Sequence, residues 1–308
     1  MISNIIVKKF LTHKTGNIIQ AYPRRGSNLH TSFPTDSKEQ LLRELSLIQK
    51  WEKDQKDLWF WEKLGRLPFV LLDRITPKAV QDFLGKVLDE LGGFIQTGGK
   101  YLISEKEIIN DLEKHAGLPS GGLTLDQVAS LPLGTMNKAA EKLKESRSEW
   151  AMIQGATTGI GGIFTLAIDI PALLGLSLKV LQEMALVYGY NPLEKRERIF
   201  IVKCLQFASA DYVGKQAVIS YLTRFQEGEI QRESISELQG WREVVATYGE
   251  NFGWKKLFQM VPVIGIIFGA FLNRSTVEDV AEAGMMLYRK RRILEKLESL
   301  NAERHPNR

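Results

Sequence analysis

The chain has 308 residues, of which 44% are hydrophobic and 25% are charged, a composition typical of a folded protein that excludes disorder over most of the length. The net charge of +5 is small, so the total charge alone does not indicate a nucleic-acid-binding protein. The lone Cys204 excludes an intrachain disulfide and fits a reducing compartment.

The N-terminal half predicts a loosely ordered arm followed by amphipathic helices. Residues 1–35 keep no helical or strand period and lack the features of a secretory signal. Strings that resemble helix caps then open stretches of helical periodicity, such as D-S-K-E at 36–39 and S-E-K-E at 104–107. Turn clusters at 117–133 mark a candidate joint inside one helical domain, 36–308.

An uncharged stretch in the middle of the chain is the strongest feature of the sequence. No residue from Trp150 to Ile168 is charged, and a pair of cap-like residues, Asp169 and Pro171, separates this stretch from a second apolar segment. The second segment ends at a turn, Tyr188–Pro192, which predicts that the next helix runs back antiparallel. Small residues in the stretch leave room for another helix or a lipid chain, and they include Gly155, Gly159 and Gly162.

A second uncharged block, 257–273, repeats the G-x-x-x-G spacing at Gly265 and Gly269. A bilayer requires about 20 consecutive apolar residues, and both blocks sit at or below that length. We therefore expect buried helical hairpins, with reversible membrane insertion as the alternative. Because no stretch alternates with a period of two, the predicted fold class is all-α, a multi-helix bundle with glycine-rich apolar helical hairpins.

The sequence offers little conventional catalytic chemistry. The run from Gly155 to Gly161 looks like the phosphate loop of short-chain dehydrogenases, but a Lys/Glu-rich helical pattern precedes it and no Y-x-x-x-K string follows. The four histidines lie outside the central helices, and no paired-cysteine spacing occurs. We expect no metal and no cofactor.

Clusters of basic residues flank the apolar blocks. They lie at helix ends rather than along one aromatic-rich face, which argues against nucleic-acid binding and suits anionic lipid headgroups better. A solvated helix face is the alternative. The predicted membrane-surface residues are Lys255, Lys256, Arg289, Arg291 and Arg292.

Two aspartates stand in apolar surroundings on either side of the turn at 188–192. Asp169 can cap a helix that starts at Pro171. It also lies nearly level with Asp211 if the flanking helices are antiparallel, and Lys215 is one turn beyond Asp211. We expect Asp169 and Asp211 to form the polar centre of the hairpin, and the catalytic pair if the protein is an enzyme.

The central block resembles the EcsC family of bacterial proteins. The resemblance rests on the glycine-rich run, on the Asp-Ile-Pro string at 169–171 and on the Tyr-Gly-Tyr turn before a long helix, and it extends from about Gly65 through the C-terminal helix. It implies a membrane-associated protein and partnership with ABC transporter components, because the family is named after a member encoded beside such a transporter. It implies no biochemical activity.

These observations lead to one expectation and one alternative. We expect a non-enzymatic helical protein, cytoplasmic and peripheral to the inner face of the cell membrane, that binds lipid or acyl chains or a transporter partner through its glycine-rich hairpin. The alternative is a lipid- or acyl-processing enzyme that uses the two buried carboxylates.

Overall fold

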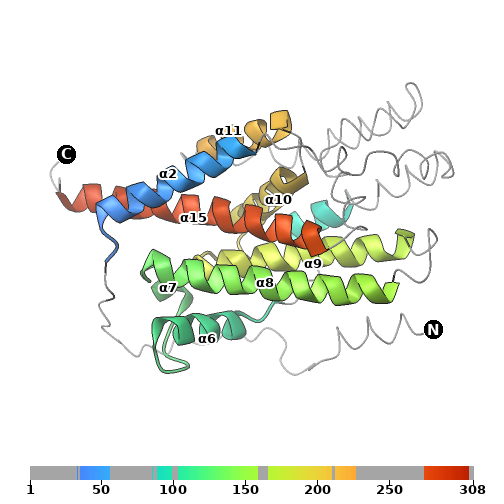
Figure 1. Cartoon of the computed structure of the whole chain (residues 1–308), viewed down its shortest axis with the longest axis horizontal. Helices are drawn as coiled ribbons and strands as arrows, with labels where there is room; N and C mark the ends of the chain where they lie inside the picture. The colour runs from blue at the N-terminus through green and yellow to red at the C-terminus, as the bar shows by residue number, and fades with distance from the viewer. Residues whose placement is uncertain are drawn as a thin grey trace. The chain divides into compact units, whose positions relative to one another are not determined.

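The computed structural model describes residues 33, 35–55, 85, 89–98, 103–158, 166–209, 212–226 and 274–304. Every regular element in these ranges is a helix and none is a strand, which confirms the all-α class. Residues 89–97 are helical. The other helices, labelled as in Figure 1, are α2 (Lys38–Asp54), α6 (Glu105–Ala116), α7 (Leu125–Val128), α8 (Leu133–Thr158), α9 (Leu166–Val187), α10 (Lys195–Ser209), α11 (Tyr212–Gln226) and α15 (Arg274–Arg304).

Helix α15 is the element against which most of the other helices pack. It contacts α8, α9, α10 and α2, and Figure 1 shows it lying between α2 and the α8–α9 pair. Its inner positions are fully buried, among them Val277, Tyr288 and Ile293. At Gly284 a β-carbon would lie 2.6 Å from Leu181 Cδ2, so the missing side chain lets α15 approach α9 closely.

Helices α8 and α9 pack side by side, and the end of α8 lies beside the start of α9 (Figure 1). Arg147 on α8 donates two hydrogen bonds to the Glu183 carboxylate on α9, from Nε to Oε2 at 2.7 Å and from Nη2 to Oε1 at 2.8 Å. Paired donors of this kind fix both distance and orientation. The structure describes no side-chain contacts for residues 155–162, so the glycine packing predicted there stays a prediction.

The helix starts are fixed by polar side chains close to the predicted positions. The predicted cap at 36–39 is shifted by one residue, because Ser37 caps α2 in a capping box with Gln40. Asp36 instead accepts the backbone N–H of Leu133 at 3.0 Å and so caps α8. Ser104 caps α6 as predicted, through the N–H of Glu107.

Two helices end on glycines with positive φ. Gly117 (φ 69) ends α6, and its neighbour Leu118 donates to Glu113 O at 2.8 Å. Gly189 (φ 77) follows α9 in the same way, with Tyr190 donating to Ala185 O at 2.8 Å. This 6→1 bond, together with a 5→2 bond, defines the Schellman motif, which favours glycine.

Glu113 holds the segment that was predicted as a joint. Its buried carboxylate accepts three backbone N–H groups, from Gly121 at 2.7 Å and from Gly122 and Leu123 at 2.8 Å. The turn between α6 and α7 is therefore tied back to α6 through one side chain.

Three expectations about helix boundaries were wrong. The cap string at 191–194 predicts one long helix that runs to about Arg224, but the structure has two helices there, α10 ending at Ser209 and α11 beginning at Tyr212. The S-T-V-E string at 275–278 predicts a helix cap at Ser275, but α15 already includes Arg274. Helix α9 begins at Leu166, before Pro171. Pro171 is the sixth residue of α9 and lies beyond the first turn, where proline is favoured, so this proline does not mark the start of the helix.

Candidate functional site

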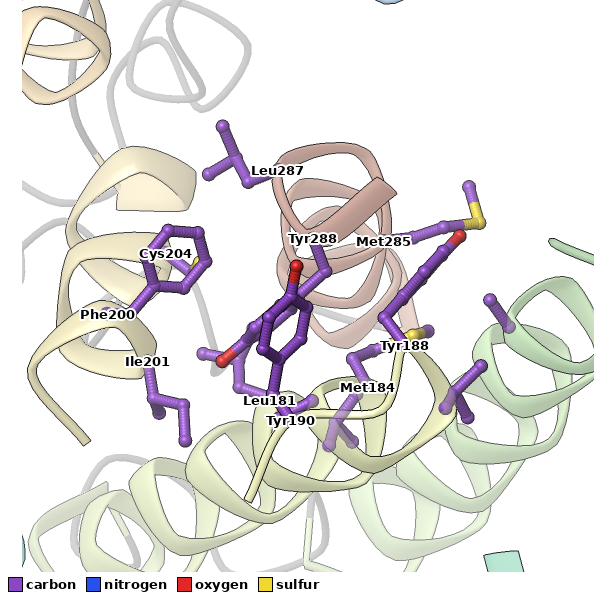
Figure 2. Packing of buried hydrophobic residues seen from close by; sticks show 14 of the residues in the cluster. Leu181, Met184, Tyr188, Tyr190, Phe200, Ile201, Cys204, Met285, Leu287 and Tyr288 are labelled. Carbon is purple, nitrogen blue, oxygen red and sulfur yellow. The ribbon is translucent and has the colours of Figure 1, made fainter. Parts of the chain in front are cut away.

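Polar side chains gather inside the bundle where the Tyr188–Tyr190 turn, α10 and α15 meet. We call this group the buried cluster. Figure 2 shows part of it, with Tyr190, Phe200 and Tyr288 filling the space between α9, α10 and α15 and Tyr188 on the side of α15 away from α10. The members of the buried cluster are Tyr188, Tyr190, Glu197, Tyr288, Arg291 and Arg292, and each of them is buried.

Glu197 is the acidic centre of the buried cluster. Its carboxylate accepts one hydrogen bond from Tyr288 Oη at 2.6 Å and one from Arg291 Nη1 at 2.8 Å. Burial raises the pKa of Glu197, and the Arg291 charge and the Tyr288 hydrogen bond oppose that rise. Glu197 lies in the first turn of α10, where the helix dipole favours a negative charge. Glu197 therefore ties α10 to α15.

Two arginines of α15 hold the Tyr-Gly-Tyr turn. Arg292 donates to the carbonyl oxygen of Tyr188 from Nη2 at 2.6 Å and from Nε at 2.9 Å, which satisfies a carbonyl at the end of α9 and places a cation at its negative pole. The guanidinium carbons of Arg291 and Arg292 lie 3.9 Å and 4.3 Å from the centroid of the Tyr190 ring. Glu295 accepts from both arginines.

Aromatic rings enclose the charged groups. The Tyr288 ring lies 4.7 Å from that of Phe200 and 5.5 Å from that of Tyr190, measured between centroids. Burial raises the pKa of Tyr288 and of Cys204 well above their ordinary values, and the nearby Glu197 charge adds to both shifts. The phenol and the thiol therefore stay protonated, and the ionised groups of the buried cluster are already paired with one another.

The predicted carboxylate pair lies at the margin of the described chain. Asp169 is in the first turn of α9 rather than at its cap, because that helix begins at Leu166. Asp211 falls outside the described residues, so the pairing with Asp169 stays a prediction. Lys215 is in α11, where its Nζ donates to Gln55 Oε1 at 2.7 Å and lies 5.4 Å from the Phe207 ring centroid.

The predicted glycine and membrane-surface residues divide into several groups. Gly155 lies within α8, whereas the remaining glycines and both lysines fall outside the described residues. They are Gly159, Gly162, Gly265, Gly269, Lys255 and Lys256. Arg289 pairs with Glu44 of α2.

Arg291 and Arg292, which the sequence placed at a membrane surface, face the interior of the bundle. They are 8% and 7% exposed, because their partners are Glu197 and the end of α9. The prediction treated 289–292 as one basic patch, but successive residues of a helix point about 100° apart.

Two residues of the buried cluster, Glu197 and Tyr288, were not predicted as site residues from the sequence. Glu197 stands in a Lys-Arg-Glu-Arg string that looks like a solvated helix start. One signal was available: Glu197 is seven residues before Cys204 and so lies on the same helix face as a cysteine expected to be buried.

A pocket of about 210 Å³ lies between α6 and α8. Its wall combines the carboxylates Glu107 and Asp111 with Lys142 and Arg147. The cations already have partners, since Lys142 Nζ lies 2.8 Å from Asp111 Oδ1 and Arg147 binds Glu183. In the described part of the chain, no group of histidines, cysteines and carboxylates is arranged to hold a metal ion.

Among the described helices, none is both long enough and apolar enough to cross a bilayer.

The fold and the buried cluster define a class of helical protein organised around a long C-terminal helix. Comparison with known families gives its identity: residues 42–293 match the EcsC protein family, and the chain belongs to that family. It is 55% identical over 272 residues to uncharacterized protein YdbA of Bacillus subtilis (strain 168), an alignment that covers 88% of this chain and 99% of YdbA. It is 28% identical over 167 residues to Protein EcsC of the same organism, which covers 54% of this chain and 68% of that protein. No solved structure matches the chain significantly.

Proposed function

We propose that the protein is a non-enzymatic, membrane-associated helical protein that binds lipid or acyl chains through the uncharged end of the α8–α9 hairpin. The observation that carries the proposal is the boundary inside the hairpin between a charged, anchored part and an uncharged part. We call the uncharged part, residues 150–168, the apolar tip.

On α8 the anchored part ends near Arg147, which pairs with Glu183 of α9. Before this pair α8 buries Met136 and Leu143, and on α9 the buried part extends from Val187 back to Leu174. Beyond Glu149 no residue is charged until Asp169. Arg147 and Glu183 therefore clamp the two helices together just before the apolar tip begins on α8, whereas on α9 the helix continues from the tip through buried residues to Glu183.

Trp150 supports an interfacial position for this boundary. It is the first residue of the apolar tip and its side chain is 50% exposed. Tryptophan is enriched where a membrane meets water, because its ring is apolar and its N–H is polar. The basic residues that precede it on α8, Lys142, Lys144 and Arg147, are paired with Asp111, Glu141 and Glu183. The interfacial position therefore rests on Trp150 and the uncharged stretch that follows it.

The buried cluster supports a binding role over a catalytic one. Glu197 is engaged by Arg291 and Tyr288, and Arg292 is engaged by the end of α9 and by Glu295. These contacts use the charged groups to fix three elements relative to each other. The proposal also includes an inner-face, cytoplasmic location. A membrane protein such as a transporter component is the alternative partner of the apolar tip.

Vesicle flotation tests the proposal. Replacing Ile163 in the apolar tip with glutamate is expected to weaken binding to phosphatidylcholine vesicles about tenfold or more, because an ionised residue is costly in a lipid environment. The matched control is Leu47→Glu, which changes an exposed leucine on α2 and should leave binding unchanged. If the wild-type protein binds no vesicles, or if both variants bind like the wild type, the apolar tip does not bind lipid.

A further inference from the structure

One face of α15 is covered by acidic residues from the N-terminal side of the described chain. We call residues 36–54, which comprise Asp36, Ser37 and α2, the acidic strap. Glu44 pairs with Arg289. Glu52 Oε1 lies 2.7 Å from Lys290 Nζ, and Asp36 Oδ2 lies 2.6 Å from Lys296 Nζ. Figure 1 shows α2 lying along α15.

The three pairs have the same polarity, with the acid on the acidic strap and the base on α15. Two of the covered cations, Arg289 and Lys296, are seven residues apart and lie on the same face of α15, and Lys290 points about 100° away from Arg289, toward Glu52. With the strap in place, the side chains of Arg289, Lys290 and Lys296 are only 16%, 20% and 17% exposed. Three cations that would otherwise form one basic surface are thus neutralised by one segment.

The other arginines of α15 do not depend on the acidic strap. Arg291 and Arg292 contact Glu197 and the end of α9 instead. Opening the strap would take one carboxylate away from each of the three cations, while Lys296 keeps its hydrogen bond to Leu131 O at 2.7 Å. The contacts of the buried cluster are separate from those of the acidic strap, which itself contributes Leu41 and Ile48 to the core and Asp36 to the cap of α8.

The acidic strap is held by apolar contacts as well as by charge. Leu41 and Ile48 are buried, and Trp51 stacks on Phe207 with ring centroids 5.3 Å apart. Trp51 Nε1 also donates to Glu282 Oε1 at 2.6 Å. These contacts give the strap a defined closed position, while its three carboxylates make that position sensitive to the electrostatic potential at the surface.

We propose that the face of α15 beneath the acidic strap is a second binding surface, for anionic lipid headgroups, and that the strap's carboxylates compete with those headgroups for Arg289, Lys290 and Lys296. The inference rests on the proposed membrane function and adds a regulated contact to it. A negative membrane surface repels Asp36, Glu44 and Glu52 and attracts the cations, so it favours the open strap. Each basic residue close to an anionic bilayer strengthens binding about fivefold.

The experiment removes the charge of the strap without removing its packing. The strap variant carries Asp36→Asn, Glu44→Gln and Glu52→Gln, and an asparagine at 36 still offers an oxygen to the N–H of Leu133. The matched control carries Asp126→Asn, Glu105→Gln and Glu298→Gln, which changes the net charge equally at three exposed positions outside the strap. A third protein adds Arg289→Gln, Lys290→Gln and Lys296→Gln to the strap variant.

Binding is measured on phosphatidylcholine vesicles with and without about one third phosphatidylglycerol. We expect the strap variant to bind the anionic vesicles about ten- to a hundredfold more tightly than the wild type, whereas the control should gain about twofold from its net charge alone. The third protein should return to wild-type affinity. Equal gains in the strap variant and the control, or a gain that survives loss of the three cations, would overturn the proposal.

Hydrogen exchange of the wild-type protein gives a readout that needs no variant to fold. Amides of α2 should exchange at least about tenfold faster when anionic vesicles are bound, while those of α10 stay protected. Unchanged exchange in α2 would contradict opening of the strap.

Inorganic phosphate serves as the control for the ligand. Adding phosphate instead of vesicles should not produce the faster exchange of α2, and if it does, the surface binds free phosphate rather than lipid. Binding to uncharged vesicles reports on the apolar tip alone, so failure of the proposed function is read separately.

Discussion

Replacing Glu197 with alanine is expected to lower the free energy of unfolding by about 3 to 5 kcal/mol. The carboxylate is buried and accepts hydrogen bonds from both Tyr288 and Arg291. Its removal leaves the Arg291 guanidinium as a buried charge without its main partner, which is far costlier than the loss of an exposed ion pair. The measurement is chemical denaturation followed by circular dichroism.

Two further variants test whether the loss of stability comes from the contacts of Glu197 rather than from any change near the start of α10. Glu194→Ala changes an exposed carboxylate just before the same helix and should cost less than about 1 kcal/mol. Replacing both partners, in Glu197→Leu with Arg291→Met, should recover much of the stability, because apolar residues of similar volume often replace a buried ion pair without loss. A loss below about 1 kcal/mol for Glu197→Ala would show that the buried cluster does not hold α10 to α15.

Replacing Gly189 with alanine is expected to cost about 2 to 4 kcal/mol. Two causes add together, since Gly189 has a φ of 77° and a β-carbon there would lie 2.8 Å from the backbone nitrogen of Ala129. A left-handed conformation costs an alanine roughly 1 to 2 kcal/mol, and overpacking against a fixed backbone costs roughly 1 to 3 kcal/mol. The turn that Arg292 caps should therefore be displaced.

Gly117→Ala is the matched control for this substitution. Gly117 also has a positive φ, of 69°, but a β-carbon there would meet no atom within 4 Å. Its replacement should cost only about 1 kcal/mol, the conformational part of the effect. Equal losses in the two variants, measured from thermal and chemical unfolding, would mean that the contact between Gly189 and Ala129 contributes nothing.

Helix identity and several helix ends could be predicted from the sequence because they depend on local chemistry. The Ser104 cap and the glycine after Ala116 act within one turn of chain, and both are where the sequence predicts them. The role of Asp36 could not be predicted in the same way. Its partners, Leu133 and Lys296, are 97 and 260 residues away, so only the tertiary fold reveals that it caps another helix.

The site was harder to predict than the fold. An ionisable residue among apolar neighbours, such as Asp169, can be recognised in the sequence as a candidate buried charge. Glu197 has charged neighbours on both sides, so the sequence around it does not indicate burial. The burial of Arg291 and Arg292 has a related cause. Both arginines are compatible with a solvated helix face until α9 and α10 pack against them.

Depth measurement at the apolar tip tests the proposed membrane function most directly. Ile160→Cys introduces a thiol that a nitroxide reagent should label selectively, because Cys204 is buried and burial keeps its pKa high. With vesicles present, the proposal predicts that the label at 160 is protected from a water-soluble relaxation agent and accessible to lipid-soluble oxygen, while the same label at Leu47→Cys keeps its aqueous accessibility. A label at 160 that remains equally accessible to the water-soluble agent with and without bound vesicles would contradict lipid contact by the hairpin.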